Sequence, residues 1–410
     1  SKDVFNSQSS NLCLNEEVAI NDTEKLLLQS IKSQLISDVP VGTFLSGGID
    51  SSIVSALMQK NLSKKIETFT IGFDDKNYDE SSHAKKIAKH LGTDHNELIL
   101  NQKETLNIIP NLSDVYDEPF ADSSQIPTIL ISKFAKQKIT VALTGDGGDE
   151  LFGGYNRYIF AKKFWKLMSN FPFVFRRGFA HSLDLFPVEF LNKFNFIFNL
   201  FVKSKVSFFG DKVSKFSHKM KFVKTIDDLF LSLLSTYQNT SSLVLNSRDE
   251  SMQIFKKKNQ LNFNNYETFM MFIDSQSYLP DDILCKVDRA AMSVSLETRV
   301  PFLDQKVVEH SWRIPVKMKI KNNEGKWILK QILNKYIPRD LTERPKMGFG
   351  IPLGDWLRDK LKDWSEYHLE ENKLKNQGYF NHVEVRKLWN DHQTKKRDWS
   401  SILWPILIFQ

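Results

Sequence analysis

The sequence predicts an α/β fold: a parallel sheet flanked by helices, followed by a mainly helical second half. Three observations predict it. Strand-like and helix-like patterns alternate over the first 160 residues, and the strand-like segments are mostly apolar, as in sheets covered on both faces. Glycine-rich segments follow two of the expected strands, and such sheets bind ligands outside the carboxyl ends of their strands. We therefore expect both segments to line one crevice.

The first four elements follow from periodicity and composition. Leu27 and Ile31 lie on one apolar side of residues 25–36, which predicts a helix. The apolar run at 39–45 predicts a strand that ends at a glycine pair. Residues 50–60 are expected to form a helix, and residues 66–73 a second strand.

The following segments continue the alternation. Residues 78–91 have apolar side chains at helical spacing, which predicts an amphipathic helix, and residues 95–100 are expected to form a third strand. A helix is expected over 126–135 and a fourth strand over 139–143. Beyond residue 160 the pattern is mainly helical, without an internal repeat or a low-complexity linker.

Charge and cysteine content exclude several classes of protein. The net charge of +7 comes from 56 basic and 49 acidic residues spread along the chain, and no nucleic-acid-binding motif is present, so we expect no nucleic-acid partner. Cys13 and Cys285 are too few and too far apart for a disulfide framework or a zinc site, and they fit a reducing cytoplasm. Residues 1–12 are polar and lack the apolar core of a signal peptide.

A phenylalanine-rich stretch at 171–209 raises the question of a membrane segment. Charged residues, among them Arg176, Asp184 and Lys193, interrupt it, and no run approaches the roughly 18 apolar residues that a spanning helix needs. Apolar residues surround much of a helix expected at 190–201, as in buried or partner-facing helices. We therefore expect this stretch to face the core, another domain or a second copy of the chain in a homodimer, and no membrane.

The segment SGGIDS, residues 46–51, has the composition of a phosphate-binding loop. Gly47 and Gly48 allow the backbone to approach a phosphate closely, and the helix that follows presents free N–H groups. Asp50 would repel a bare phosphate, so its presence implies Mg²⁺ between the two. An ordinary turn with a helix cap is the alternative, but the complete hexapeptide at a strand–helix junction favours phosphate binding.

A second segment places three carboxylates at the end of the fourth strand. Asp146, Asp149 and Glu150 lie within five residues, and two carboxylates about 4 Å apart repel by about 4 kcal/mol at an effective dielectric near 20. A bound cation reverses the sign of that interaction. Because the strand before them is expected to be buried, the segment favours a metal site over an exposed acidic turn.

These segments carry a resemblance to a known family. The loop at 46–51 resembles the pyrophosphate loop of ATP pyrophosphatases, which share an adenine nucleotide alpha-hydrolase-like fold, and no kinase-type phosphate loop is present. Four segments in order resemble asparagine synthetases: VPVGTFLSGGIDSS (39–52), TGDGGDELFGGY (144–155), KVDRAAMSVSLETRVPFLD (286–304) and RPKMGFGIP (344–352). The similarity runs from about residue 20 to residue 410, which implies a synthetase domain over 21–410 preceded by a leader or linker remnant over 1–20.

The resemblance implies roles for individual residues. The residues that would hold the pyrophosphate are Ser46, Gly47, Gly48, Asp50, Ser51 and Ser52. The implied Mg²⁺ ligands are Asp50 and Asp149. The residues that would contact adenosine are Leu45, Ile71, Thr144 and Gly145. Asp146 and Lys346 would form an ion pair at the reaction centre, although many family members have glutamate at the position of Asp146. Lys346 would stabilise the transferring phosphoryl group, and its glycine-rich surroundings at 344–354 would form a lid.

The implied reaction is amide formation from aspartate, ATP and ammonia, giving asparagine, AMP and pyrophosphate through a β-aspartyl-AMP intermediate. Asp146 is a candidate base for the attacking nitrogen. The four motifs leave the acceptor open, and a uronic acid of a surface polysaccharide, a peptide or a β-lactam precursor are the alternatives. A tRNA-modifying ATP pyrophosphatase is another alternative. It would need cysteines for sulfur transfer or a basic nucleic-acid-binding domain, and the sequence shows neither. A catalytically inactive interaction protein would not need Asp50, Asp149, Asp146 and Lys346 together.

One feature of the family is missing from this sequence. Glutamine-dependent asparagine synthetases carry an N-terminal glutaminase domain that begins with a nucleophilic cysteine, whereas this sequence begins Ser1-Lys2-Asp3. We expect ammonia-dependent amidation, with a glutaminase domain or subunit as the ammonia source.

The sequence leaves two further groups of residues open between structural and substrate-binding roles. The first is Glu297, Arg299, Pro301, Phe302 and Asp304, where a structural role is favoured for Arg299 and Asp304. The second is the DEPFADSS segment at 117–124, where helix capping is the simpler role.

Overall fold

The computed structural model describes residues 15–74, 79–184, 220–237, 240–247, 265–342 and 350–410, with the single residues 213, 217 and 263. The chain divides into two compact units. The first consists of residues 1–159 and 252–351, and the second of residues 160–251 and 352–410. The first unit contains the sheet and every sequence motif that the structure describes.

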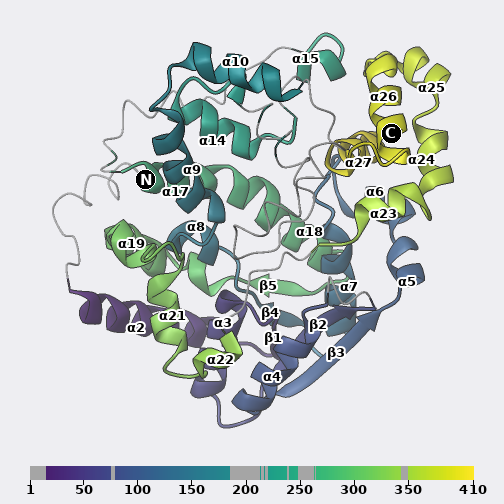
Figure 1. Ribbon diagram of the computed structural model, residues 1–410. Coiled ribbons are helices and arrows are strands. Elements are labelled where there is room, and N and C mark those ends of the chain that lie inside the picture. The colour runs from purple at the N-terminus through teal and green to yellow at the C-terminus, as the bar shows by residue number, and fades with distance from the viewer. Residues whose placement is uncertain are drawn as a thin grey trace. The chain divides into compact units, whose positions relative to one another are not determined.

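The sheet has five parallel strands in the order β3-β2-β1-β4-β5 (Figure 1). Their bounds are β1 Val41–Phe44, β2 Glu67–Phe73, β3 Asp94–Leu100, β4 Val141–Leu143 and β5 Glu297–Arg299. The chain adds β2 and β3 on one side of β1 and then places β4 on the other side. The strand order therefore reverses between β1 and β4, which is where open parallel sheets bind their ligands.

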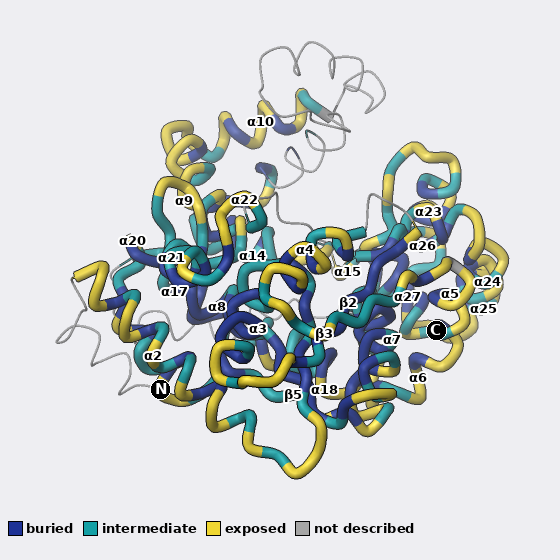
Figure 2. Tube along the Cα trace, turned by 90° about the horizontal axis from the view of Figure 1, so that it is seen from below, coloured by how far each residue is buried: buried dark blue, intermediate teal, exposed yellow. Residues whose placement is uncertain are grey.

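Helices cover both faces of this sheet (Figure 1). α3 (Ile49–Asn61) packs on β1, α4 (Ser81–Leu91) packs on β2 and β3, and α2 (Glu16–Gln34) lies against α3. α7 (Gln125–Ala135) packs on β2 and against α18 (Cys285–Met292). Residues 52–58 of α3 and residues 68–73 of β2 are all buried, and Figure 2 shows the interior of α3 as a continuous buried stretch. The apolar strands are thus explained by burial on both faces.

The remaining elements of the first unit are mostly short. They are α5 Gln102–Leu106, η2 Ile109–Asn111, α6 Leu112–Val115, α8 Gly148–Phe152, α17 Tyr266–Gln276, the π-helix η4 Leu279–Leu284, η5 Pro301–Leu303, α19 Gln305–Arg313, α20 Val316–Lys319, α21 Trp327–Leu333 and α22 Arg339–Thr342. α9 (Asn156–Met168) begins in this unit and ends in the other.

The second unit is helical throughout the part that the structure describes. Its helices are α10 Phe173–Asp184, α14 Ile226–Leu234, α15 Thr240–Leu243, α23 Leu353–Arg358, α24 Lys362–His368, α25 Glu371–Gln377, α26 His382–Gln393 and α27 Ser400–Phe409. The apolar helix expected at 190–201 lies outside the described residues. Within the described part of the chain, no helix is both long and apolar enough to cross a membrane.

The fold class and the four expected strands are confirmed, with two differences. α2 begins at Glu16 rather than near residue 25, because the Asn15 side chain caps it by accepting from the Glu17 and Val18 N–H groups at 2.8 and 3.2 Å. β5 was not expected at all. It is three residues long and begins with the exposed Glu297, so it has no apolar pattern, and its pairing with β4 defines it.

Lys319, at the end of α20, is a buried lysine in this fold. Its exposed fraction is 2%, and its Nζ lies 5.0 Å from the centre of the Trp312 ring. Burial lowers its pKa to about 7. Between this pH and the ordinary pKa of lysine near 10.4, the unfolded chain binds more protons here than the folded protein, so stability rises with pH.

We expect Lys319→Met to stabilise the protein at about pH 6.5, by more than about 1 kcal/mol, because the buried charge is removed. The gain should shrink as the pH approaches about 10, where Lys319 is neutral in both states. Urea denaturation at several pH values measures it, with the exposed Lys317→Met in the same helix as control. A gain in stability that does not change with pH would show that the charge of buried Lys319 is not its cause.

Candidate active site

The two glycine-rich segments meet at a cavity of about 290 Å³ beyond the carboxyl ends of β1, β2 and β4. Ten of the thirteen residues predicted from the sequence to have a catalytic, nucleotide-binding or metal-binding role line it: Leu45, Ser46, Gly48, Asp50, Ser51, Ile71, Thr144, Gly145, Asp146 and Asp149. The expected single crevice at the strand tips is therefore present. The cavity lies outside the carboxyl ends of β1 and β4, the two strands between which the strand order reverses, and open parallel sheets bind their ligands at this point.

The segment at 46–51 is held in shape by its own hydroxyl groups. The Oγ atoms of Ser46 and Ser51 lie 2.9 Å apart, and the Ser46 N–H donates to Ser51 Oγ at 3.2 Å. Gly47 has a φ of 76°, in the left-handed region that favours glycine. Gly48 stands at the N-cap of the 13-residue α3. The start of this helix lies at the cavity, and helix N-termini attract anions.

The second segment approaches the first so closely that glycine is required. A Cβ atom on Gly145 would lie 2.8 Å from the Ser51 nitrogen, and one on Gly148 would lie 2.6 Å from Asp50 Oδ1. Gly147 adopts a φ of 83° at the N-cap of α8. These glycines let the strand tip of β4 pack directly against the start of α3, which brings Asp149 beside Asp50.

Asp50 and Asp149 converge on one buried ammonium group, that of Lys326. Lys326 Nζ lies 2.7 Å from Asp149 Oδ1 and also bonds Asp50 Oδ2. The lysine is 6% exposed; burial alone would lower its pKa, but the charges of Asp149 and Asp50 raise it above the ordinary value. Its own N–H donates to the carbonyl of Phe152 at 3.2 Å, which ties it to the end of α8.

Sequence reasoning missed Lys326. Lys326 follows a polar turn, NNEG at 322–325, and is the N-cap residue of α21. Nothing in the sequence distinguishes this turn from other surface turns. The one local sign of close packing at this turn is Gly325, since a Cβ atom there would overlap the carbonyl oxygen of Gly153. Lys326 also lines a second cavity of about 610 Å³, which shares Ser46, Gly48, Asp50 and Asp149 with the first and includes Gly47.

The carboxylates fit a Mg²⁺ ion that also binds phosphate. Asp50 and Asp149 point to a common position, and Mg²⁺ is usually held by one or two carboxylates together with substrate phosphates and water. Among the described residues, no group of three or more His, Cys, Asp or Glu side chains could hold a metal by itself. Phosphate oxygens would have to complete the coordination, so a metal and a phosphate would bind together.

Asp146 lines the same cavity and is partly buried. Loss of solvation raises its pKa and the charge of Asp149 acts in the same direction, whereas a hydrogen bond from Thr144 and the charge of Lys286 lower it. Its expected partner Lys346 falls in 343–349, outside the described residues. Lys286, which also lines the cavity, is therefore the described cation that acts on Asp146.

Not every predicted residue reaches the cavity. Ser52 is fully buried one turn into α3, where its N–H donates to the carbonyl of Gly48 at 3.0 Å. Arg299 donates to the carbonyls of Gln34 and Ile36 at 2.6 and 2.9 Å, and Asp304 caps α19 by accepting from the Lys306 N–H. These contacts agree with the structural role favoured for Arg299 and Asp304.

The side of the cavity that was predicted to contact adenosine is apolar. Leu45 and Ile71 are 0% and 3% exposed, and Phe73 lies beside them in the cavity lining. The Leu45 N–H donates to the carbonyl of Phe69 at 2.9 Å, which continues the β1–β2 ladder to the edge of the cavity. A flat, apolar ring could bury its faces against this wall.

Comparison with known proteins adds a family match. The sequence model of the family described as Asparagine synthase matches residues 22–410. A glutamine-hydrolyzing asparagine synthetase 1 of Bacillus subtilis is 30% identical over 398 residues, which cover 96% of this chain and 59% of the relative. A putative asparagine synthetase of Mycobacterium tuberculosis is 27% identical over 405 residues, 96% of this chain and 57% of the relative. The chain spans less than three fifths of the length of these curated relatives.

Lys326→Met tests the charge balance of the site. It should lower the free energy of unfolding by roughly 3 kcal/mol, because two partly buried carboxylates lose their common counter-ion. Millimolar Mg²⁺ should restore part of that loss, since a divalent cation can replace the ammonium group between them. Chemical denaturation with and without Mg²⁺ measures both effects.

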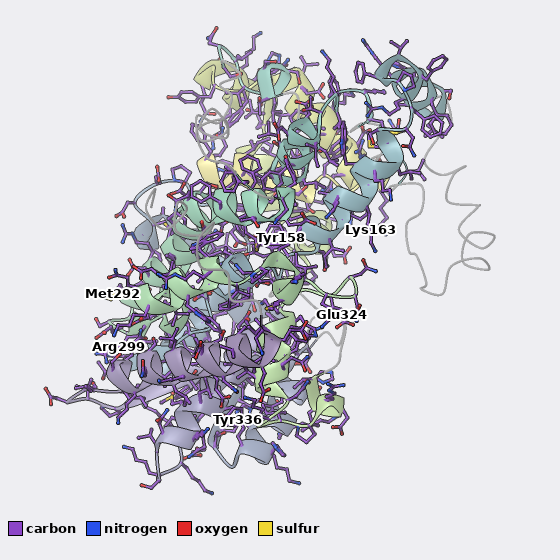
Figure 3. The ribbon with its side chains drawn as sticks, turned by 90° about the vertical axis from the view of Figure 1, so that its left-hand side faces the viewer. Tyr158, Lys163, Met292, Arg299, Glu324 and Tyr336 are labelled. Carbon is purple, nitrogen blue, oxygen red and sulfur yellow. The ribbon has the colours of Figure 1, made fainter. Side chains whose placement is uncertain are left out.

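The matched control is Lys330→Met, four residues along. Lys330 forms an exposed ion pair with Glu324 at 2.7 Å, and Figure 3 shows Glu324 at the surface. Such pairs contribute about 0.5 kcal/mol or less. Equal destabilisation by the two substitutions would show that the Asp50–Lys326–Asp149 cluster is no more important than a surface pair.

Proposed function

The chain belongs to the asparagine synthase family, and we propose that it uses ATP to activate a carboxylate as its AMP ester, which ammonia converts into an amide. Aspartate is the proposed acceptor and asparagine the product. The observation that carries this proposal is the convergence of Asp50 and Asp149, from neighbouring strand tips, at a glycine-rich loop and a helix start inside one cavity.

The cavity offers a separate surface for each part of ATP. Leu45, Ile71 and Gly145 would contact adenosine, and the loop at 46–51 with the N-terminus of α3 would hold the pyrophosphate. A Mg²⁺ ion held by Asp50 and Asp149 would neutralise charge on the departing pyrophosphate. Lys326, buried beside both carboxylates, would keep its positive charge at any pH near neutrality and so face the phosphates as a fixed cation.

The reaction then has two steps. An oxygen of the acceptor carboxylate attacks the α-phosphorus of ATP, and the bond from that phosphorus to pyrophosphate breaks. Ammonia next attacks the carbonyl carbon of the acyl-adenylate, AMP leaves, and a base takes one proton from the attacking nitrogen. Asp146 is the proposed base, because it lines the cavity and its raised pKa makes it a better proton acceptor than an ordinary aspartate.

Two further elements of the proposal concern parts of the chain or its partners that the structure does not describe. Lys346, which lies outside the described residues, would reach the α-phosphoryl group, and a lid formed by the glycine-rich segment around it would exclude water from the acyl-adenylate. A glutaminase domain or subunit would supply ammonia, as the names of the relatives imply for those proteins.

Isotope exchange between pyrophosphate and ATP tests the first step without ammonia. Aspartate should support exchange, and Asp50→Asn and Asp149→Asn should each reduce it by roughly 100-fold or more, because charge stabilisation at the phosphates is lost. Asp117→Asn is the control, since the Asp117 side chain is 78% exposed and lies outside the cavity lining. Exchange with a uronic acid but not with aspartate would support carboxylate activation and show that the acceptor is not aspartate. Absence of exchange with every acid would refute the proposal.

Asp146→Asn separates the second step from the first. If Asp146 is the base, the variant should retain exchange within about threefold of the wild type and lose amide formation by roughly 100-fold. Hydroxylamine, which is largely unprotonated near neutral pH, should react with the adenylate at nearly the same rate in both proteins. Unchanged amide formation from ammonia would exclude Asp146 as the base.

A further inference from the structure

One part of the cavity wall remains after the groups of ATP have been assigned. It is formed by Ser124, Thr128, Glu150, Tyr155, Ile283 and Lys286. Within the described part of the chain, Lys286 is the one basic residue in the lining of this cavity. The remaining wall therefore combines a single ammonium group with carboxylates and hydroxyl groups, and the acceptor has to bind there if ATP occupies the rest.

Lys286 is held in a fixed position. Its Nζ lies 2.5 Å from Asp122 Oδ2 and 3.8 Å from Asp282 Oδ1, and its residue is 8% exposed. Asp122 is itself fixed, because it accepts hydrogen bonds from the N–H and Oγ of Ser124 at 2.9 and 2.8 Å. An ammonium group has three N–H donors, and only one is needed for the close contact with Asp122, so others can serve a ligand in the cavity.

The backbone supports the same placement. Asp282 belongs to the π-helix Leu279–Leu284, which runs directly into α18, and Lys286 lies in the first turn of α18. π-helical turns are rare and are frequently found at functional sites. The Tyr116 hydroxyl donates to the carbonyl of Lys286 at 3.3 Å and ties this turn to the segment before α7.

Two acidic groups that differ in protonation lie beside Lys286. Burial, followed by the charge of Asp122, raises the pKa of Asp282 to about 7, so Asp282 is partly protonated there. Asp122 stays ionised, since Lys286 and the bonds from Ser124 outweigh its burial and lower its pKa. Asp122 therefore offsets the charge of Lys286, and Lys286 can bind an anionic group through the N–H donors that the contact with Asp122 does not use.

Glu150 supplies a hydrogen-bond acceptor on the same wall, and burial raises its pKa to about 7. Its residue is 1% exposed, and the Tyr155 hydroxyl donates to its Oε1 at 2.5 Å. Arg157 stacks on the Tyr155 ring at 4.1 Å and pairs with Asp274 at 3.0 Å, which fixes Tyr155 from behind. Glu150 and Lys286 thus present a fixed carboxyl oxygen, which can accept a hydrogen bond, and a fixed ammonium group to one space.

We propose that Lys286 is a specificity-determining residue that binds the non-reacting carboxylate of an amino-acid acceptor, while Glu150 receives the ammonium group of that acceptor. The inference rests on the proposed function and narrows its acceptor to amino acids with a second carboxylate. The bound ends of the acceptor leave the side-chain carboxylate free to reach the α-phosphorus, beside Asp146. An ammonium group and a hydrogen-bond acceptor in the same wall match the carboxylate and the ammonium group of an α-amino acid.

The test compares acceptors that differ by one charged group in pyrophosphate–ATP exchange. Aspartate has both groups, β-alanine lacks the second carboxylate, and succinate lacks the ammonium group. The variant is Lys286→Gln, whose amide can still donate to Asp122, with Lys286→Arg as the charge-conserving control. The KM values for aspartate and for ATP are measured separately.

The expected result is selective. Lys286→Gln should raise the KM for aspartate on the order of 10- to 100-fold, the loss of one charged hydrogen bond. The KM for ATP should stay within about twofold, and kcat/KM for β-alanine should not change, because β-alanine has no carboxylate for Lys286 to bind. Lys286→Arg should recover most of the preference for aspartate over β-alanine.

Other outcomes overturn the inference in distinguishable ways. An equal loss of kcat/KM for aspartate and for β-alanine would show that Lys286 has a structural role or acts on the reaction itself. A change in the KM for ATP would show that Lys286 contacts the nucleotide. Wild-type exchange with a uronic acid but not with aspartate would refute the amino-acid subsite and leave carboxylate activation intact. Absence of exchange with every acid would refute the proposed function as well.

Discussion

Two carboxylates from neighbouring strand tips share one buried cation, and the other features of the site depend on this arrangement. Asp50 and Asp149 would repel each other strongly at this separation without Lys326 between them. Because the ammonium group occupies the position that both carboxylates face, the pair is already organised for a cation before any ligand binds. The same contact joins three segments of the first unit, α3, α8 and the start of α21, so the charge balance of the site also contributes to the packing of the fold.

Glycine makes that contact sterically feasible. The carboxylates meet because the turn after β4 lies directly on the first turn of α3, and a Cβ at Gly145 or Gly148 would fall inside normal contact distance of Ser51 or Asp50. The reversal of strand order between β1 and β4 supplies the gap into which both turns project. Sheet topology, glycine placement and ion pairing therefore act at one location. A substitution that changes any of them would affect both the surface proposed to bind phosphate and the surface proposed to bind the metal.

The two lysines of the described site differ in environment, and the difference suggests a division of roles. Lys326 is enclosed by the carboxylates proposed to bind the metal, so its charge lies beside the loop proposed to hold the phosphates. Lys286 is paired with Asp122 and lines the cavity together with Glu150, Ser124 and Thr128. A reaction that joins a nucleotide to a carboxylate needs positive charge at both partners, because phosphate and carboxylate are anions that repel each other. Lys286 lines this cavity itself, whereas Lys326 lines the second cavity and is joined to the first through its ion pairs with Asp50 and Asp149.

The sequence by itself determined the parallel α/β fold, four of the five strands, and the residues of the two glycine-rich segments, including Asp50, Asp146 and Asp149. These could be predicted because the relevant information is local: alternating periodicity, strand-end glycines and carboxylates within a few residues of each other. Only the tertiary structure identified β5, Lys326 and the Lys286–Asp122 pair. β5 exists through its pairing with β4, and Lys326 and Lys286 meet their carboxylates across 276 and 164 residues of chain. A single lysine in a polar turn carries no local pattern, since its partners are chosen by packing and charge compensation in the folded chain.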